Sequence, residues 1–159
     1  MQIRPARVDD APAISALITR HLPLLAVRPD GAGAGTFLEF IAPVAIQAYD
    51  TAPNFRYAVA ELGAALAGVV AVRDGTHLFH LFVASEFQRQ GIARRLWAHA
   101  MQEAQSAGRV EAFSVNSSLS AVPVYERLGF VVCGEQVEPH GVAFVPMRMT
   151  APGVQGAPA

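Results

Sequence analysis

The segment that most restricts the fold of this chain is a strand-like run followed at once by a glycine turn and a helix-like run. Residues Thr76 to Val83 are rich in aromatic and branched side chains, which is typical of a buried strand. Residues Ile92 to Ala107 carry apolar side chains at helical spacing, and Gly108 suits the position after a helix end. Between the two runs, Gly91 offers no side chain. The segment therefore predicts a strand–turn–helix unit with an accessible helix start.

The turn has the properties of an anion site. A helix start presents unpaired N–H groups and the positive end of the helix dipole, both of which favour a phosphate. Glycine at position 91 and alanine at 93 allow a ligand to approach the backbone closely. Arg89, Arg94 and Arg95 add positive charge. The pattern fits a diphosphate site, but an ordinary turn whose glycine only eases packing is an equally good interpretation of the glycine alone.

Residues 1–150 are expected to form a single α/β domain. The chain alternates strand-like and helix-like segments in the order strand, two helices, three strands, helix, strand, helix, two strands, and this order predicts a mixed, mostly antiparallel sheet of about seven strands with about four helices. The strands are expected at 3–8, 55–62, 65–73, 76–83, 110–115, 130–137 and 142–149, and the helices from residue 11, over 37–49, 92–107 and 120–128. The Pro- and Gly-rich residues 151–159 are expected to be a disordered tail.

Composition excludes several classes of protein. The net charge of −1 favours binding neither to nucleic acid nor to an anionic membrane, and no apolar run is long enough to span a bilayer. A single cysteine, Cys133, excludes an internal disulfide and is expected to be a small buried residue. With no leader-like start, the expectation is a cytoplasmic protein. The apolar fraction of 52% is high, and a homodimer interface is one candidate explanation.

Three motifs together resemble those of the GCN5-related N-acetyltransferase superfamily. The first is Gln88-x-x-Gly91-x-Ala93, which resembles the family's Gln/Arg-x-x-Gly-x-Gly/Ala turn. The second is the strand before it, ending Leu81-Phe82-Val83, and the third is the segment from Ala121 through Tyr125 to Gly129-Phe130. Their order and the helix and strand between them make the resemblance specific. It implies a sheet that is splayed between the fourth and fifth strands.

The resemblance implies acetyl-coenzyme A as co-substrate. The diphosphate is expected on the N–H groups of Gln90 to Arg94, and the pantetheine arm along the edge of the strand that ends at Val83. Where the family often carries Asn, seven residues before Tyr125, this chain has Ser118, and Asn116 lies two residues earlier, so either could contact the cofactor. The expected cofactor-binding residues are Leu81, Phe82, Val83, Gln88, Arg89, Gln90, Gly91, Ile92, Ala93, Arg94, Asn116 and Ser118.

The expected catalytic groups are Tyr125, His77 and His80. The motif implies that Tyr125 is a general acid for the departing thiolate, whereas its spacing alone would fit a core tyrosine. The strand before the turn has no carboxylate, so His77 or His80 could be the base. Because they are three positions apart, a regular strand would place them on opposite faces. A half-buried structural role for each, or a water chain with no dedicated base, remains open.

The resulting expectation is an N-acetyltransferase that moves an acetyl group from acetyl-coenzyme A to a primary amine of a small molecule or peptide. The apolar segment around Phe37 and Tyr49 favours a small or partly apolar amine over a highly charged polyamine. No metal is expected, because the histidines lack metal-ligand spacing. The alternative is a module that binds an acyl-coenzyme A without turnover. Trp97 is expected in the core.

Overall fold

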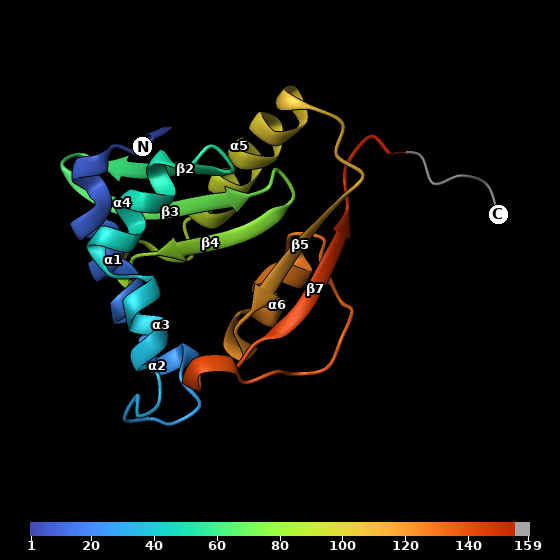
Figure 1. Ribbon diagram of the computed structural model, residues 1–159. Coiled ribbons are helices and arrows are strands. Elements are labelled where there is room, and N and C mark those ends of the chain that lie inside the picture. Colours follow the sequence, from blue (N-terminus) through green and yellow to red (C-terminus); the bar gives the residue numbers. More distant parts are fainter. Residues whose placement is uncertain (155–159) are drawn as a thin grey trace.

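The computed structural model, which describes residues 1–154, contains a seven-stranded sheet in the order β1-β2-β3-β4-β5-β7-β6 (Figure 1). The α/β architecture with a mixed sheet is confirmed. The strands are β1 (Gln2–Pro5), β2 (Phe55–Leu62), β3 (Ala65–Arg73), β4 (His77–Val83), β5 (Ala112–Ser117), β6 (Val131–Val132) and β7 (Val145–Thr150). The helices are α1 (Ala11–Arg20), α2 (Leu22–Leu25), α3 (Gly35–Phe40), α4 (Pro43–Thr51), α5 (Ile92–Ala107) and α6 (Val122–Arg127).

The sheet divides between β4 and β5. Every other neighbouring pair is antiparallel, but β4 and β5 run parallel and are paired only at His77↔Ser114 and Leu78↔Val115. Beyond Leu78 the two strands separate, so that β2, β3 and β4 form one group and β5 and β7 a second, tilted group (Figure 1). The expected splay between the fourth and fifth strands is therefore present.

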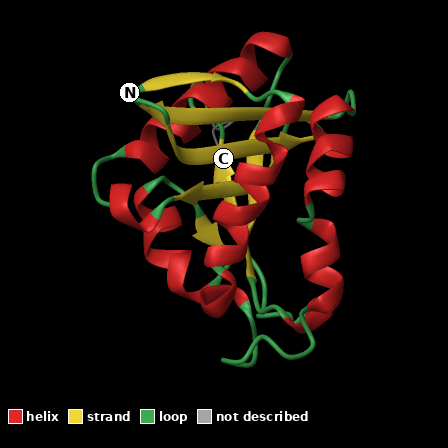
Figure 2. Cartoon of the chain, turned by 90° about the vertical axis from the view of Figure 1, so that its left-hand side faces the viewer, coloured by secondary structure: helices red, strands yellow, loops and turns green. Residues whose placement is uncertain are grey.

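Helices cover both faces of the sheet (Figure 2). Helix α5 packs against β2, β3 and β4, and its Leu96 and Trp97 are buried in the cluster on that face, as expected for Trp97. Helices α1 and α4 pack on the other face, where Ile18 and Ile46 are buried. In residues 1–154 no helix has the length and apolarity needed to cross a membrane.

Several elements depart from the sequence predictions. Where about four helices were expected, residues 1–154 form six: α2 is an additional short helix after α1 with Pro23 in its first turn, where proline is tolerated, and the region expected over 37–49 forms α3 and α4. The closing hairpin is mostly irregular: β6 has two residues, and Val137 and Phe144 form only an isolated bridge. Cys133 is exposed, so the prediction that it is a small buried residue was wrong.

The chain remains packed beyond residue 150. Ala151 is buried, and its N–H donates to the carbonyl of Glu111 at 2.9 Å. Val154 packs against the core cluster on the α5 face. Of the tail predicted at 151–159, residues 155–159 lie outside the described part of the chain.

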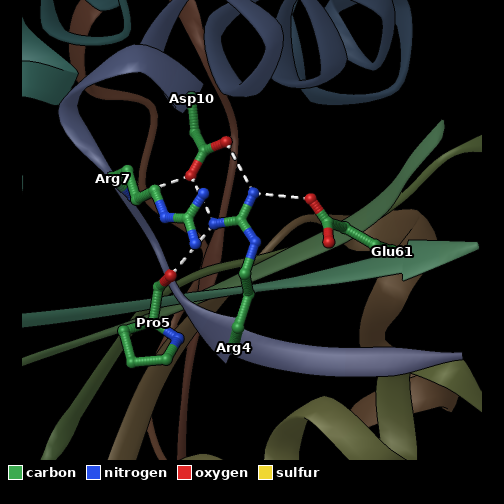
Figure 3. A network of polar contacts seen from close by, with 5 residues as sticks. All are labelled: Arg4, Pro5, Arg7, Asp10 and Glu61. Atoms are coloured by element: carbon green, nitrogen blue, oxygen red, sulfur yellow. Dashed lines mark hydrogen bonds and ion pairs between the residues drawn. The ribbon is translucent and has the colours of Figure 1, made fainter. Parts of the chain in front are cut away.

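An ion-pair network holds the outer strand β1 to the start of α1 (Figure 3). Arg4 donates to both carboxylate oxygens of Asp10, at 2.8 and 2.9 Å, and also pairs with Glu61 on β2. Asp10 additionally accepts the N–H of Arg7 at 2.7 Å. An aspartate directly before a helix can cap it, but Asp10 makes no side-chain cap bond with α1 because its carboxylate is turned toward Arg4. Hydrogen bonds from Arg4 hold the pKa of Asp10 below its ordinary value, against the opposing effect of burial.

Replacing Arg4 with Met should lower the free energy of unfolding at pH 7 by about 1–3 kcal/mol, since a part-buried carboxylate loses charge-assisted hydrogen bonds. The folded-state pKa of Asp10 is lowered, so its contribution is present above the ordinary carboxyl value of 3.8 and is lost as the pH falls through the folded value. Urea unfolding should therefore show that the gap between Arg4→Met and wild type shrinks in acid. Arg28→Met is the control, because the ion pair of Arg28 with Asp30 is exposed. This variant should have the free energy of unfolding of wild type both at pH 7 and in acid. A gap that stays constant down to acid pH would contradict the assignment.

Candidate active site

The turn between β4 and α5 has the backbone shape that the glycine predicted. Gly91 is the N-cap residue of α5 with φ 76°, and Arg89 also has a positive φ of 61°. No side chain caps the helix. The N–H of Arg95 donates to the carbonyl of Gly91 at 3.1 Å, and this is the first hydrogen bond of the helix. The N–H groups of the residues before Arg95 therefore have no acceptor within the helix. This leaves a row of backbone donors at the positive end of a helix that runs to Ala107.

The edge of β4 next to this turn is held by one side chain. Beyond Leu78 this edge has no ladder partner in β5. The carbonyl of Val83 accepts a hydrogen bond from the Gln88 side chain, with Nε2 and O separated by 3.1 Å. The same Gln88 Nε2 lies 3.4 Å from Nε2 of His21, at the end of α1. Gln88 thus joins the turn, the strand edge and helix α1.

A cavity of about 570 Å³ lies where the strands separate, a volume in the range of small-molecule sites. It is bordered by the end of β4, the first turn of α5, the end of β5, helix α6, and the α1–α2 segment. The structure brings together around it the predicted residues Leu81, Phe82, Val83, Gln88, Arg89, Gly91, Ile92, Ala93, Arg94, Asn116, Ser118 and Tyr125. Gln90, His77 and His80 do not line it, while both Asn116 and Ser118 do.

Tyr125 has one side in the core and one toward the cavity. It is 8% exposed, and its ring meets that of Phe130 edge to face with centroids 5.7 Å apart. Burial raises the pKa of Tyr125, because the apolar surroundings disfavour the phenolate. The hydroxyl therefore keeps its proton at neutral pH and can donate it.

His80 is built into the core instead of the cavity. Its Nδ1 and the hydroxyl of Tyr57 are hydrogen-bonded at 3.1 Å, and burial lowers the pKa of His80 to about 3. The expectation that His77 and His80 lie on opposite faces was wrong. Strand β4 carries a β-bulge at Phe79, since His80 pairs with Ala71 and Leu78 with Val72. The extra residue reverses the alternation, and both histidines lie on the face covered by α1 and α4.

His77 lies at the paired end of β4, away from the split. Its Nδ1 is 2.8 Å from the hydroxyl of Ser114, on the neighbouring strand β5. Burial, followed by the positive charge of Arg73, lowers the pKa of His77. The ring is therefore neutral at physiological pH. It is hydrogen-bonded to β5 where β4 and β5 are still paired.

Several cavity residues were missed by sequence reasoning. His21, Leu24 and Leu25 reach the cavity from the end of α1 and from α2, and Phe79 reaches it from the bulge. Arg127 also lines it, from the last turn of α6. One signal in the sequence is Leu22-Pro23 directly after a helix, because a proline in this place can also start a new helix.

The charge around the cavity is of one sign. Among the residues that line it, all within the described part of the chain, Arg89, Arg94 and Arg127 are cationic and none is Asp or Glu. Over residues 1–154 the structure also shows no cluster of three or more His, Cys, Asp or Glu side chains that could hold a metal ion. The cavity is therefore suited to an anionic ligand with an apolar portion.

Residues 20–151 match the model of the acetyltransferase (GNAT) domain family, and the chain belongs to this family. The match covers β2 to β7 and every wall of the cavity. The resemblance drawn from the three motifs is confirmed.

Individual relatives are more distant. A 78-residue stretch of the chain is 37% identical to human N-acetyltransferase 8. The matched stretch covers 44% of this chain and 34% of that protein, so the chain spans about a third of that relative's length. The PaiA N-acetyltransferase of Thermoplasma acidophilum, solved with coenzyme A, has a TM-score of 0.75 at 13% identity, with 94% of this chain and 98% of that one covered. The yncA protein of Salmonella typhimurium, solved with its cofactor acetyl-CoA, has a TM-score of 0.66 at 17% identity, with 100% and 98% covered.

Replacing Gly91 with Ala should weaken coenzyme A binding about tenfold, because an L-residue in the left-handed region costs about 1–2 kcal/mol that a shifted turn would relieve. Gly63→Ala is the matched control: Gly63 has φ 60°, both glycines have open space around the added Cβ, and Gly63 lies in the β2–β3 turn. Both variants should lose similar thermal stability, but only Gly91→Ala should lose affinity in calorimetric titration. Equal affinities in the two variants would show that the turn geometry does not matter for binding.

Proposed function

We propose that this protein is an N-acetyltransferase that transfers an acetyl group from acetyl-coenzyme A to a primary amine by direct attack in a ternary complex. The observation that carries the proposal is the single cavity that unites the bare start of α5, the unpaired edge of β4 and the Tyr125 side chain. Membership of the acetyltransferase family supports the same reaction class.

The cofactor would bind along two elements. The N–H groups from Gln90 to Arg94 would hold the diphosphate, with Arg89 and Arg94 as partners for phosphate oxygens. The pantetheine arm, which is rich in amides, would add to the free edge of β4 at Leu81 to Val83 in the manner of an extra strand. Asn116 and Ser118 line the opposite side of the cavity, and either could bond to the arm.

The chemistry needs a polarised carbonyl and a proton for the thiolate. A backbone N–H near Val83 would donate to the thioester oxygen as negative charge develops on it. Tyr125 would give its proton to the sulfur as the carbon–sulfur bond breaks, and its raised pKa keeps that proton in place until then.

The acceptor we propose is a small amine with an apolar portion and one positive charge. Leu24, Leu25, Phe79 and Phe82 offer apolar contacts on the cavity wall. The lining residues, all of them described, include no carboxylate, so a second ammonium group would be buried beside arginines without a counter-ion. This composition disfavours polyamines.

The alternative is a module that holds an acyl-coenzyme A without turnover. The presence of Tyr125 on the cavity wall favours an enzyme, because binding alone does not need a proton donor next to the thioester.

The test is thiol release from acetyl-coenzyme A with a panel of amino acids, monoamines, polyamines and peptides. Phenethylamine-like monoamines should exceed spermidine at least about tenfold in kcat/KM, because each uncompensated buried charge costs more than 1.4 kcal/mol. A silent panel combined with tight coenzyme A binding would favour the module, and a preference for spermidine would contradict the proposed acceptor class.

Tyr125→Phe should reduce kcat by about 100-fold or more, the usual contribution of a general acid, and leave the affinity for coenzyme A unchanged. Tyr49→Phe is the matched control. Tyr49 stacks on Phe55 on the face of the sheet that α1 and α4 cover, and it does not line the cavity. The turnover of this variant should therefore equal that of wild type. Undiminished turnover in Tyr125→Phe would remove the tyrosine from the mechanism.

A further inference from the structure

Among the described residues that line the cavity, one carries an imidazole ring. An acceptor amine is mostly protonated at pH 7, so it must lose a proton before attack, and a basic group on the cavity wall can receive that proton. Within residues 1–154, the lining includes no carboxylate, and neither His77 nor His80 belongs to it. His21 does. Imidazole is the side chain whose ordinary titration range matches this task.

The hydrogen bonds of His21 define which ring nitrogen is available. His21 is the C-cap residue of α1, and its Nδ1 lies 2.9 Å from the carbonyl oxygen of Leu17. A carbonyl can only accept, so Nδ1 carries the hydrogen and Nε2 has the free lone pair in the neutral ring. Nε2 faces the amide nitrogen of Gln88, a donor, at 3.4 Å. Both contacts assign the same tautomer. The contact with Gln88 is long and occupies the Nε2 lone pair in this structure, so an incoming ammonium group would have to replace it.

His21 and Tyr125 reach the split from opposite faces of the sheet. The His21 ring meets Phe82 edge to face at 5.4 Å, and Phe82 packs with the cluster on the α1 and α4 face. Tyr125 belongs to the cluster on the α5 face. A thioester lying between β4 and β5 would have an imidazole on one side and a phenol on the other. In the tetrahedral intermediate the amine nitrogen and the sulfur are two different substituents of one carbon, so a base beside the nitrogen and an acid beside the sulfur can act without competing for one position.

From this geometry we infer that Nε2 of His21 is the general base that takes the proton from the acceptor ammonium; the inference rests on the acetyltransferase reaction proposed above. The freed amine attacks the thioester carbon, and a carbon–nitrogen bond forms. The nitrogen loses its second proton, the carbon–sulfur bond breaks, and the thiolate takes a proton from Tyr125, which is restored from that second proton through water. One proton remains on His21 and passes to solvent.

His21→Gln tests this role, because glutamine can still donate to the Leu17 carbonyl but accepts no proton at neutral pH. With phenethylamine, or the best protonated amine of the panel, kcat at pH 7 should fall about 100-fold. With O-benzylhydroxylamine, which is unprotonated at this pH, the loss should stay under about tenfold, because no ammonium proton needs removal. The affinity for coenzyme A should be unchanged in the variant.

The pH profile gives a second measurement. With the protonated amine, the rate of His21→Gln should rise as the pH approaches 9, about tenfold per pH unit, as the free amine fraction increases. The other charged or titratable groups on the cavity wall are Arg89, Arg94, Arg127 and Tyr125. Burial raises the pKa of Tyr125, so its proton stays in place over this range and the rise in rate reports the deprotonation of the acceptor.

The control is His77→Gln, which removes a histidine of β4 that does not line the cavity and should keep turnover close to wild type with both amines. Equal losses for both amines in His21→Gln, or a loss confined to His77→Gln, would overturn the inference while leaving the acetyltransferase proposal intact. If wild type acetylates no member of the panel, both proposals fail together.

Discussion

The structure depends on the separation of two neighbouring parallel strands. β4 and β5 share two paired positions and then diverge, so the backbone groups along the free edge of β4 lose their ladder partners. Buried backbone groups that lack partners are costly, and a protein must satisfy them or offer them to a ligand. Here Gln88 satisfies the Val83 carbonyl, and the remaining edge borders the cavity. A ligand with alternating amide groups can complete the interrupted sheet.

The start of α5 reaches this edge because β3 carries a glycine beneath it. A Cβ on Gly68 would lie 2.9 Å from Cδ1 of Leu96 and 2.9 Å from the carbonyl oxygen of Phe82. The missing side chain lets the helix pack closely on β3 while its first turn stays next to the end of β4. The strand edge and the helix N–H groups therefore border the same cavity. Their juxtaposition is a product of packing, and the turn sequence alone does not determine it.

Local features of the sequence predicted the parts of this arrangement that are themselves local. The strand, glycine turn and helix from Thr76 to Ala107 follow from periodicity and from the conformational freedom of glycine. The positions of His77 and His80 could not be derived in this way, because the bulge at Phe79 depends on pairing with β3 and reverses the faces. His21 was missed for a related reason: Leu17 is its neighbour in α1, but Phe82 and Gln88 lie on β4 and in the turn after it, and only the tertiary fold brings these to His21. Cys133 follows β6, the strand at the end of the sheet, whose two residues are themselves exposed, and such an edge position could not be derived from the local pattern.

The central claim is that backbone N–H groups at the start of α5 bind the diphosphate of coenzyme A while the edge of β4 binds its pantetheine arm. Backbone amide NMR during titration with coenzyme A, and separately with pantetheine, which lacks the diphosphate, tests it most directly. Coenzyme A should shift the amides of residues 90–94 and 81–83, and pantetheine only those of 81–83. Unshifted amides at 90–94 in saturating coenzyme A, with the changes centred instead on the hollow between Arg56 and His99, would contradict the account.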